Sequence, residues 1–215
     1  MNRHDLLILN EKAIQIAGIS AKSILKSIPG MSFHDMVERS HQRIPAIVRR
    51  QQSRRAGMVD VGFSTPRHFE GVRCTFLSMV PESGIEEVID PFAVLEKAVR
   101  TNAMPRQAAM LHAAAAALGA GFRLGLFGSF AMQAMTGMPY ATRGSDMDLL
   151  LQGDLSRIRE VSDRLCEIET IYGIRMDVEV RLDMGYDVKM KELLSPGSTI
   201  LGKSLTELKL IAFQH

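Results

Sequence analysis

Hydrophobic and polar positions alternate most regularly near the end of the chain, over residues 174–182. Hydrophobic residues take every second position there, and charged residues take positions between them: Met176, Val178, Val180 and Leu182 against Asp177, Glu179 and Arg181. This period of two predicts a strand with one apolar and one polar face. The segment before it, 154–170, repeats its hydrophobic residues at helical spacing, which predicts a long amphipathic helix.

Shorter runs of the same two patterns predict the other elements. Strands are expected at residues 1–9, 44–48, 59–63, 72–80, 122–127, 146–151 and 186–191, and helices at about 11–28, 32–43, 91–101, 106–118 and 130–136. Residues 193–204 are expected to be irregular, with a short element at 205–213. Because helices and strands intermingle along the whole chain, the predicted fold class is α+β.

A turn at residues 81–84 and a helix start at Asp90-Pro91 indicate two domains. We expect a smaller N-terminal α+β domain over residues 1–80 and a larger domain over 90–215. Net charge divides along a similar line: residues 1–80 hold 12 Lys and Arg against 6 Asp and Glu, and the remainder hold 14 against 18. The basic first domain is therefore expected to meet an anionic ligand or an acidic protein.

The composition of the chain bears on its cellular compartment and on the partners that it is expected to bind. The chain has 215 residues, 46% of them hydrophobic, but no run of about 18 apolar residues that would span a membrane. Its start lacks a signal-peptide pattern, and Cys74 and Cys166 are far apart, which favours free core thiols over a disulfide. The expected compartment is the cytoplasm. Nucleic acid is not an expected partner, because the basic run at 49–55 has no interleaved aromatic residues and the net charge is only +2.

The stretch Gly125–Leu151 carries the most informative chemistry. It joins two apolar strands through Gly128-Ser129 and a short helix. A glycine at a strand-to-helix turn allows close approach to the backbone, and the free N–H groups of a helix N-terminus attract phosphate. Gly128 and Ser129 are therefore predicted to bind phosphate.

Two carboxylates, Asp146 and Asp148, open the second of these strands one residue apart. Alternation along a strand puts both on one face, where they lie close together at low cost only if a cation lies between them. Asp177 and Glu179 share a face of a later strand and offer a third carboxylate. A phosphate cradle with acids on neighbouring strands predicts Mg²⁺-dependent phosphoryl or nucleotidyl transfer. The alternative is that the aspartate pair only solvates a strand end.

These features together resemble the DNA polymerase beta-like nucleotidyltransferases, which share the order of Gly-Ser, Asp-x-Asp opening a strand, and an acid on a later strand. The 16 residues between Ser129 and Asp146 are more than many members have. A narrower resemblance, to the malonate decarboxylase holo-acyl-carrier-protein synthases or phosphoribosyl-dephospho-CoA transferases, accounts for that gap. It covers nearly the whole chain, through the segments Arg3–Leu7, Pro45–Arg50, Val61–Phe63, Gly128-Ser129, Thr136–Tyr140 and Ser145–Leu151.

This resemblance implies a nucleotidyltransferase-type mixed sheet with flanking helices, and a definite reaction. The donor would be 2′-(5″-triphosphoribosyl)-3′-dephospho-CoA, and the acceptor a serine of the malonate decarboxylase acyl-carrier subunit. Pyrophosphate would leave, with Mg²⁺ as the cofactor, and the first domain could bind the donor or the carrier protein. The alternatives are transfer to another small-molecule or protein acceptor, and a non-catalytic nucleotide-binding regulator.

The resemblance also implies roles for the acids. Three acids on neighbouring strands can hold two Mg²⁺ ions, and Asp146 and Asp148 would bind both of them. Asp177 would complete the metal site and help to deprotonate the acceptor serine. Glu179 is the alternative third acid, and Val178 stands where the family pattern has a glycine between the two.

The remaining roles concern the triphosphate. Gly128 and Ser129 would hold its oxygens. Arg143, three residues before Asp146, could reach the leaving pyrophosphate, or it could be a solvated loop arginine.

Overall fold

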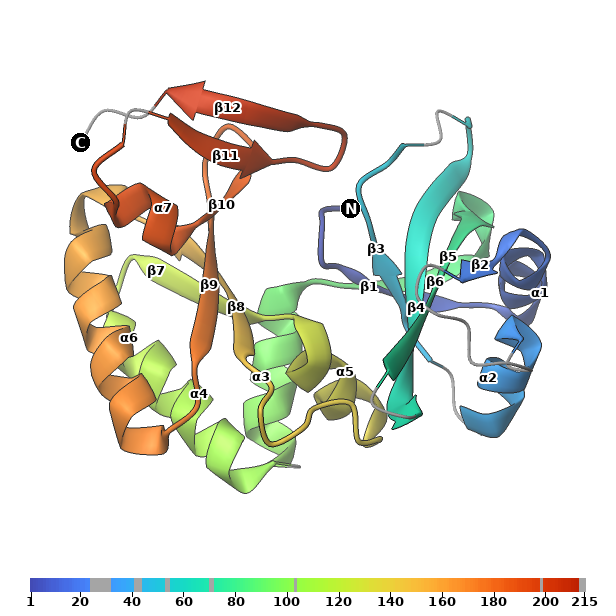
Figure 1. Cartoon of the computed structure of the whole chain (residues 1–215), viewed down its shortest axis with the longest axis horizontal. Coiled ribbons are helices and arrows are strands. Elements are labelled where there is room, and N and C mark those ends of the chain that lie inside the picture. Colours follow the sequence, from blue (N-terminus) through green and yellow to red (C-terminus); the bar gives the residue numbers. More distant parts are fainter. Residues whose placement is uncertain are drawn as a thin grey trace. The chain divides into compact units, whose positions relative to one another are not determined.

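The computed structural model describes residues 1–23, 32–40, 44–52, 55–69, 72–102, 104–197 and 199–212. It separates into two compact units, one of Met1–Asp90 with Met138–Tyr140, the other of Pro91–Gly137 with Ala141–His215. Each unit contains its own sheet (Figure 1). Helices and strands are mixed in both, so the α+β prediction is confirmed.

The first unit is built on an antiparallel sheet. Its elements are β1 (Leu6–Leu9), α1 (Glu11–Ser20), β2 (Lys22–Ser23), α2 (Phe33–Ser40), β3 (Ala46–Val48), β4 (Met58–Phe69), β5 (Val72–Pro81), a 3-10 turn (Glu82–Gly84) and β6 (Ile85–Ile89). Among the described residues the strand order is β2-β5-β4-β3-β1-β6. Small and branched side chains on the inner face are fully buried, among them Leu7, Ala46 and Val61. Strand β6, which the sequence pattern did not predict, pairs with β1 and so joins this sheet.

The helix predicted over residues 11–28 is wrong beyond Ser20. The backbone turns extended at Ala21, and Lys22–Ser23 then pair with β5 at the sheet edge. The Ser20 and Ser78 hydroxyls hydrogen bond at 2.7 Å, which ties the end of α1 to that strand. Residues 24–28 lie outside the described residues. By contrast, the helix predicted over residues 32–43 is confirmed as far as Ser40, and residues 41–43 lie outside the described residues. Ser32 and Asp35 cap the start of this helix reciprocally.

The second unit has a mixed sheet flanked by helices. Its elements are α3 (Pro91–Thr101), α4 (Pro105–Leu118), β7 (Phe122–Leu126), α5 (Gly128–Thr136), β8 (Met147–Gly153), a 3-10 turn (Leu155–Arg157), α6 (Ile158–Tyr172), β9 (Met176–Arg181), β10 (Asp187–Lys189), α7 (Met190–Leu194), β11 (Thr199–Lys203) and β12 (Leu208–Ala212). The strand order is β12-β11-β10-β9-β8-β7, and among the strand pairs of the described residues only β8–β9 runs parallel.

The parallel pair is joined by α6, which packs alongside α4 (Figure 1). The apolar stripe predicted for this helix is buried through Ile158, Val161, Leu165 and Ile168. Cys166 lies on its exposed side, so the expectation of a core thiol is wrong for this cysteine, although both cysteines are free and Cys74 is buried. Within the described ranges, no helix combines the length and apolar composition needed to cross a bilayer.

Two predictions near the C-terminus are wrong. The strand expected over 186–191 is observed only over Asp187–Lys189, because α7 begins at Met190, and the irregular stretch expected over 193–204 contains β11. Strand β11 pairs with β12 at the end of the sheet, where Ile200 and Ile211 are buried opposite one another. Packing of that inner face, which short-range pattern does not reveal, stabilises the hairpin.

Candidate active site

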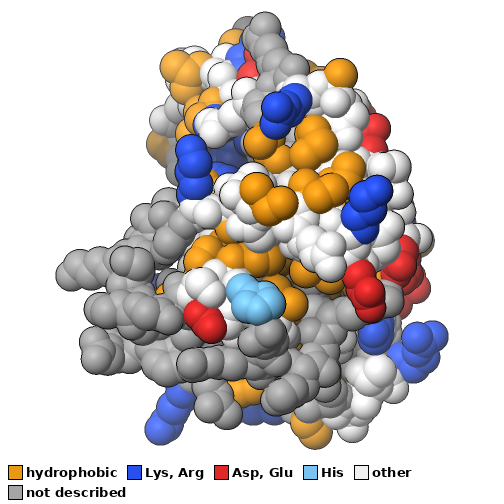
Figure 2. Space-filling view, turned by 90° about the vertical axis from the view of Figure 1, so that its right-hand side faces the viewer, with side chains coloured by type: hydrophobic (Ala, Val, Ile, Leu, Met, Phe, Trp, Pro, Cys, Tyr) orange, Lys and Arg blue, Asp and Glu red, His pale blue; other side chains and the backbone are white. Residues whose placement is uncertain are grey.

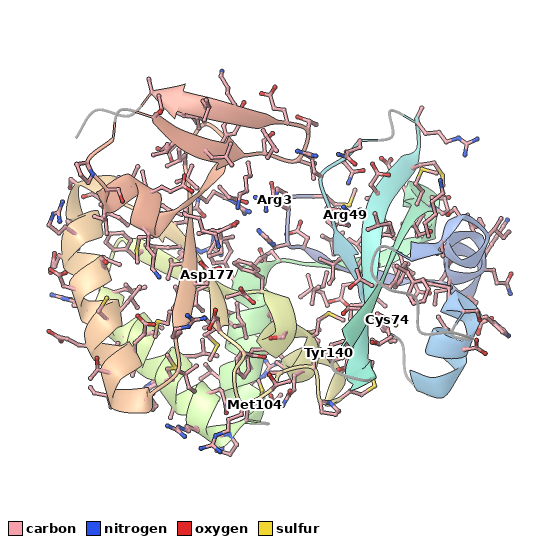
Figure 3. The ribbon with its side chains drawn as sticks, viewed as in Figure 1. Arg3, Arg49, Cys74, Met104, Tyr140 and Asp177 are labelled. Atoms are coloured by element: carbon pink, nitrogen blue, oxygen red, sulfur yellow. The ribbon has the colours of Figure 1, made fainter. Side chains whose placement is uncertain are left out.

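The two strands of the parallel pair place an aspartate each at the same level of the sheet. Asp148 on β8 is the register partner of Asp177 on β9, and Leu150 is the partner of Glu179. Register partners in neighbouring strands share a face, so Asp148, Asp177 and Glu179 line one side. Met147 and Leu149 point to the other side and are fully buried. The structure therefore brings together carboxylates that lie about 30 residues apart in the chain. Figure 3 labels Asp177 on β9.

Gly128 holds the backbone against the carboxylate of Asp148. Helix α5 begins at Gly128, two residues earlier than predicted, with φ at 70°. A Cβ at this position would lie 1.9 Å from Asp148 Oδ2. The N–H of Phe127 also donates to the Asp148 carbonyl at 3.0 Å. The turn between β7 and α5 and the acid on β8 are thus packed into one unit that only glycine permits.

The other predicted phosphate ligands lie on or beside the same helix. Ser129 is the second residue of α5 and is buried. Arg143 is exposed in a turn closed by Thr142 and Ser145, whose N–H donates to the Thr142 carbonyl at 3.1 Å. The N–H of Ala141 donates to the Gln133 side chain on α5 at 3.0 Å. The Arg143 loop is therefore anchored to the helix that carries Ser129.

Asp146 is held by an arginine that the sequence analysis did not select. Arg175 donates from Nε and Nη2 to the two oxygens of Asp146, at 2.8 and 2.7 Å. Arg175 precedes β9, and its carbonyl accepts from the N–H of Met147 at 2.7 Å. This arginine lies next to Asp146 only because β8 and β9 pair in parallel, a long-range pairing that local pattern does not predict.

Two lysines contact the acids of this face, and neither was predicted from the sequence as a site residue. Lys189 on β10 lies opposite Glu179, and its ammonium donates to Asp177 and lies 3.8 Å from Glu179 Oε1. Lys203 on β11 donates to the same Glu179 oxygen at 3.0 Å. The Glu179 side chain is 4% exposed, and that of Asp177 is 38% exposed. The two acids thus differ: Glu179 is enclosed by two cations, and Asp177 is open to solvent.

The acidity of Asp148 is strongly perturbed. Burial, the larger cause, and the negative charge of Asp177 together raise the pKa of the Asp148 carboxyl from 3.8 to about 6, and Lys189 opposes the rise. Smaller contributions from Asp146 and Glu179 also raise this pKa. An acid that is costly to ionise among other acids fits a site for a hard cation, because a bound cation would offset that cost. Such a cation would exchange with Arg175 and Lys189, which contact Asp146 and Asp177 here.

A separate hollow of about 650 Å³ lies within the first unit, between α1 and α2. Its lining is largely apolar, with Ile14, Ile19, Phe33 and Val37 among the residues, and it contains none of the predicted site residues. Figure 2 views the molecule from the side of these two helices, where hydrophobic side chains reach the surface.

Comparison with known proteins agrees with the motifs over nearly the whole chain. The family model for the phosphoribosyl-dephospho-CoA transferase MdcG N-terminal domain matches residues 2–91, and that for the MdcG C-terminal domain matches residues 94–213. Two curated relatives, from two strains of Xanthomonas campestris pv. campestris, are named phosphoribosyl-dephospho-CoA transferase. Each is 33% identical over 162 residues, which is 74% of this chain and 74% of the relative. No solved structure matches the chain.

The family resemblance that the sequence motifs indicated is therefore confirmed, and the chain is a transferase enzyme. Both halves of the chain match the models of one family. The curated relatives carry that family's name, and 74% of their length aligns with this chain. This protein belongs to the phosphoribosyl-dephospho-CoA transferase family.

Proposed function

We propose that this transferase attaches the 2′-(5″-triphosphoribosyl)-3′-dephospho-CoA prosthetic group to a serine of the malonate decarboxylase acyl-carrier subunit, by Mg²⁺-dependent nucleotidyl transfer. The observation that carries the proposal is the register pairing of Asp148 with Asp177, with Gly128 packed against Asp148. It joins the three sequence features of a nucleotidyl-transfer site, a glycine turn, an Asp-x-Asp strand and a later acid, at one end of a parallel strand pair.

Asp146, Asp148 and Asp177 are the residues that would hold the metal. Their carboxylate oxygens are the donors that Mg²⁺ prefers. When bound, Mg²⁺ would offset the negative charge of the triphosphate and make its α-phosphorus easier to attack. Asp177 is supported over Glu179 as the third acid, because it lies directly beside Asp148 and is more exposed.

The residues of α5 and its loop would bind the donor. The N–H groups of Gly128 and Ser129 lie in the first turn of a nine-residue helix, where the peptide dipoles favour an anion. Arg143, exposed on the loop that Gln133 anchors, would approach the pyrophosphate portion. These contacts would orient the triphosphate so that its α-phosphorus faces the acids.

The transfer itself breaks one phosphoanhydride bond and forms one phosphoester bond. The serine oxygen forms a bond to the α-phosphorus, and the bond from that phosphorus to the oxygen bridging the β-phosphorus breaks. The electron pair of the broken bond leaves with pyrophosphate. Asp177 would assist removal of the hydroxyl proton of the acceptor serine.

The first unit has its own proposed part in this reaction. We propose that it binds the donor or the carrier protein, since residues 1–80 hold 12 Lys and Arg against 6 Asp and Glu. A cytoplasmic location stays a prediction.

Intact-mass measurement of the apo carrier subunit tests the proposal. The carrier is incubated with enzyme, Mg²⁺ and triphosphoribosyl-dephospho-CoA, and Asp148→Asn enzyme serves as the matched control. A carrier mass gain equal to the donor minus pyrophosphate, absent with the control, is the expected result. If the folded wild-type enzyme leaves a competent carrier unmodified, the acceptor assignment is wrong.

A further inference from the structure

We infer that Lys189 is a displaceable counter-ion of the active site, which pairs with Asp177 in the metal-free enzyme and contacts the donor's phosphate oxygens once that carboxylate binds metal. This inference rests on the proposed function and adds a residue to it. The starting observation is that Lys189 contacts the exposed acid Asp177 while lying opposite the buried acid Glu179.

The position of Lys189 on β10 directs its side chain along the acidic face. Because Lys189 and Glu179 are register partners, their side chains share that face. The Lys189 ammonium reaches past Glu179 to Asp177, and the lysine side chain remains 30% exposed. A lysine carries a compact charge on a flexible four-carbon stem, so this ammonium can shift between neighbouring anions without a change in the backbone.

Lys203 makes the departure of Lys189 inexpensive. If Lys189 were the sole partner of Glu179, its departure would leave a buried carboxylate uncompensated, which is strongly unfavourable. Lys203 instead donates to Glu179 at 3.0 Å, closer than the 3.8 Å between Lys189 and the same oxygen. Glu179 therefore retains a cation when Lys189 moves away, and Glu179 with Lys203 forms the fixed part of the cluster.

The charges of this face also assign Lys189 to an anionic ligand. Four acids of this face lie in ion pairs, Asp146 with Arg175, Asp177 with Lys189, Glu179 with Lys203 and Asp187 with Arg181, and Asp148 is a fifth acid. A divalent cation held by Asp146, Asp148 and Asp177, together with the nearby Arg175, balances the charge of these three acids. The ammonium of Lys189 is then in excess beside that cation, and a triphosphate is the anion that would take it.

Mn²⁺ binding in the absence of donor tests the displacement directly. The dissociation constant of Mn²⁺ is measured by electron paramagnetic resonance for wild-type, Lys189→Gln and Lys203→Gln enzymes. Removal of a competing cation from Asp177 should tighten Mn²⁺ binding about threefold in Lys189→Gln, the scale of a part-exposed ion pair. Lys203→Gln, which leaves Lys189 in place, should show no tightening. Lys189→Met repeats the test with an apolar side chain of similar length if the glutamine variant folds poorly.

Donor kinetics supply the second half of the test. The kcat/KM for donor should fall about tenfold or more in Lys189→Gln, through loss of a charge-assisted contact, although the same variant binds Mn²⁺ more tightly. If Lys189 had only a structural role, its substitution would weaken Mn²⁺ binding and lower kcat/KM for donor together. Unchanged or weaker Mn²⁺ binding in Lys189→Gln overturns the inference, and so does equal tightening in Lys203→Gln. If wild-type enzyme modifies no carrier, the proposed function fails separately, and the Mn²⁺ comparison still decides the counter-ion role.

Discussion

At the scale of single residues, the contact between Gly128 and Asp148 determines the form of the site. A Cβ at Gly128 would overlap the Asp148 carboxylate, and the positive φ of this residue already disfavours other side chains. The glycine was predicted as a place where phosphate approaches the backbone. In the structure, the group that approaches closest is an acid of the site itself, so the glycine positions Asp148 as well as opening the helix N-terminus.

Substitution of Gly128 tests this positioning. Gly128→Ala should lower the rate of transfer about 100-fold, because the added methyl group displaces Asp148 by about an ångström. The same substitution should lower the free energy of unfolding by about 1–2 kcal/mol, because alanine is disfavoured in the left-handed backbone conformation of this position. Gly137→Ala is the matched control: its φ is 72°, but a Cβ there would meet nothing within 4 Å. Urea unfolding should show similar losses for both variants, while transfer falls steeply only in Gly128→Ala. Equal activity in the two variants would contradict the positioning role.

The raised pKa of Asp148 predicts a pH-dependent stability difference. The folded enzyme holds the Asp148 proton more tightly than the unfolded chain does, because the pKa rises from 3.8 to about 6. Ionisation of Asp148 therefore lowers stability: the penalty is absent below about pH 4, grows between pH 4 and 6, and is complete above pH 6. In EDTA at pH 8, Asp148→Asn should be more stable than wild type by about 1–2 kcal/mol, after allowance for solvent screening. Urea titrations at pH 4 and pH 8 measure the gap, which should close at the lower pH; a gap that widens there would refute the assignment.

At the scale of elements, the two acids on one face of β9, Asp177 and Glu179, lie in different environments. Asp177, beside Asp148, faces the open part of the site, and Glu179, two residues on, is enclosed by Lys189 and Lys203. A strand pattern of alternating charges cannot distinguish these two positions. Their difference comes from the strands on each side: β8 supplies an acid beside Asp177, and β10 and β11 supply cations around Glu179.

Matched amides at these two positions should separate catalysis from stability. Asp177→Asn should reduce transfer about 100-fold or more with a stability change within about 1 kcal/mol, because its ion pair is partly exposed. Glu179→Gln should cost about 2 kcal/mol of stability, because it removes the buried negative charge that faces Lys189 and Lys203, and should retain more transfer activity than Asp177→Asn. Transfer rates and urea midpoints of the two variants give the comparison. Greater loss of transfer in Glu179→Gln would make Glu179 the third metal ligand.

At the scale of the whole molecule, metal binding should raise the free energy of unfolding. If Asp146, Asp148 and Asp177 form the metal site, Mg²⁺ at ten times its dissociation constant should stabilise the fold by about 1.4 kcal/mol, since the unfolded chain has no assembled site. Thermal unfolding with and without Mg²⁺ measures this as a rise of a few degrees in Tm. Asp148→Asn should lose most of the rise, and Ca²⁺ serves as a comparison for charge without the same coordination geometry. An equal rise in wild type and Asp148→Asn would place the metal elsewhere.

The pattern of hydrophobic and polar residues was sufficient for most elements of the fold and for its class. It placed the β8–α6–β9 segment closely, because long periodic stretches with caps define their own structure. It failed at β6 and the end of α1, where the chain pairs with strands far away in the sequence, and at β11, a short strand that lies between β10 and β12 near the end of the sheet. The free energy that stabilises such segments comes from the sheet edge they join, so their own residues carry little signal.

The residue types of the site and their order can be read from the sequence alone: the glycine turn at Gly128, the Asp146-x-Asp148 pair and a later acid, together with the family to which the chain belongs. The tertiary structure decided which groups meet. Parallel pairing of β8 with β9 put Asp148 beside Asp177 and Arg175 beside Asp146, and the antiparallel strands beyond brought lysines to Glu179. Ion pairs and perturbed pKa values depend on distances of a few ångströms between residues far apart in the chain, and only the folded sheet sets those distances.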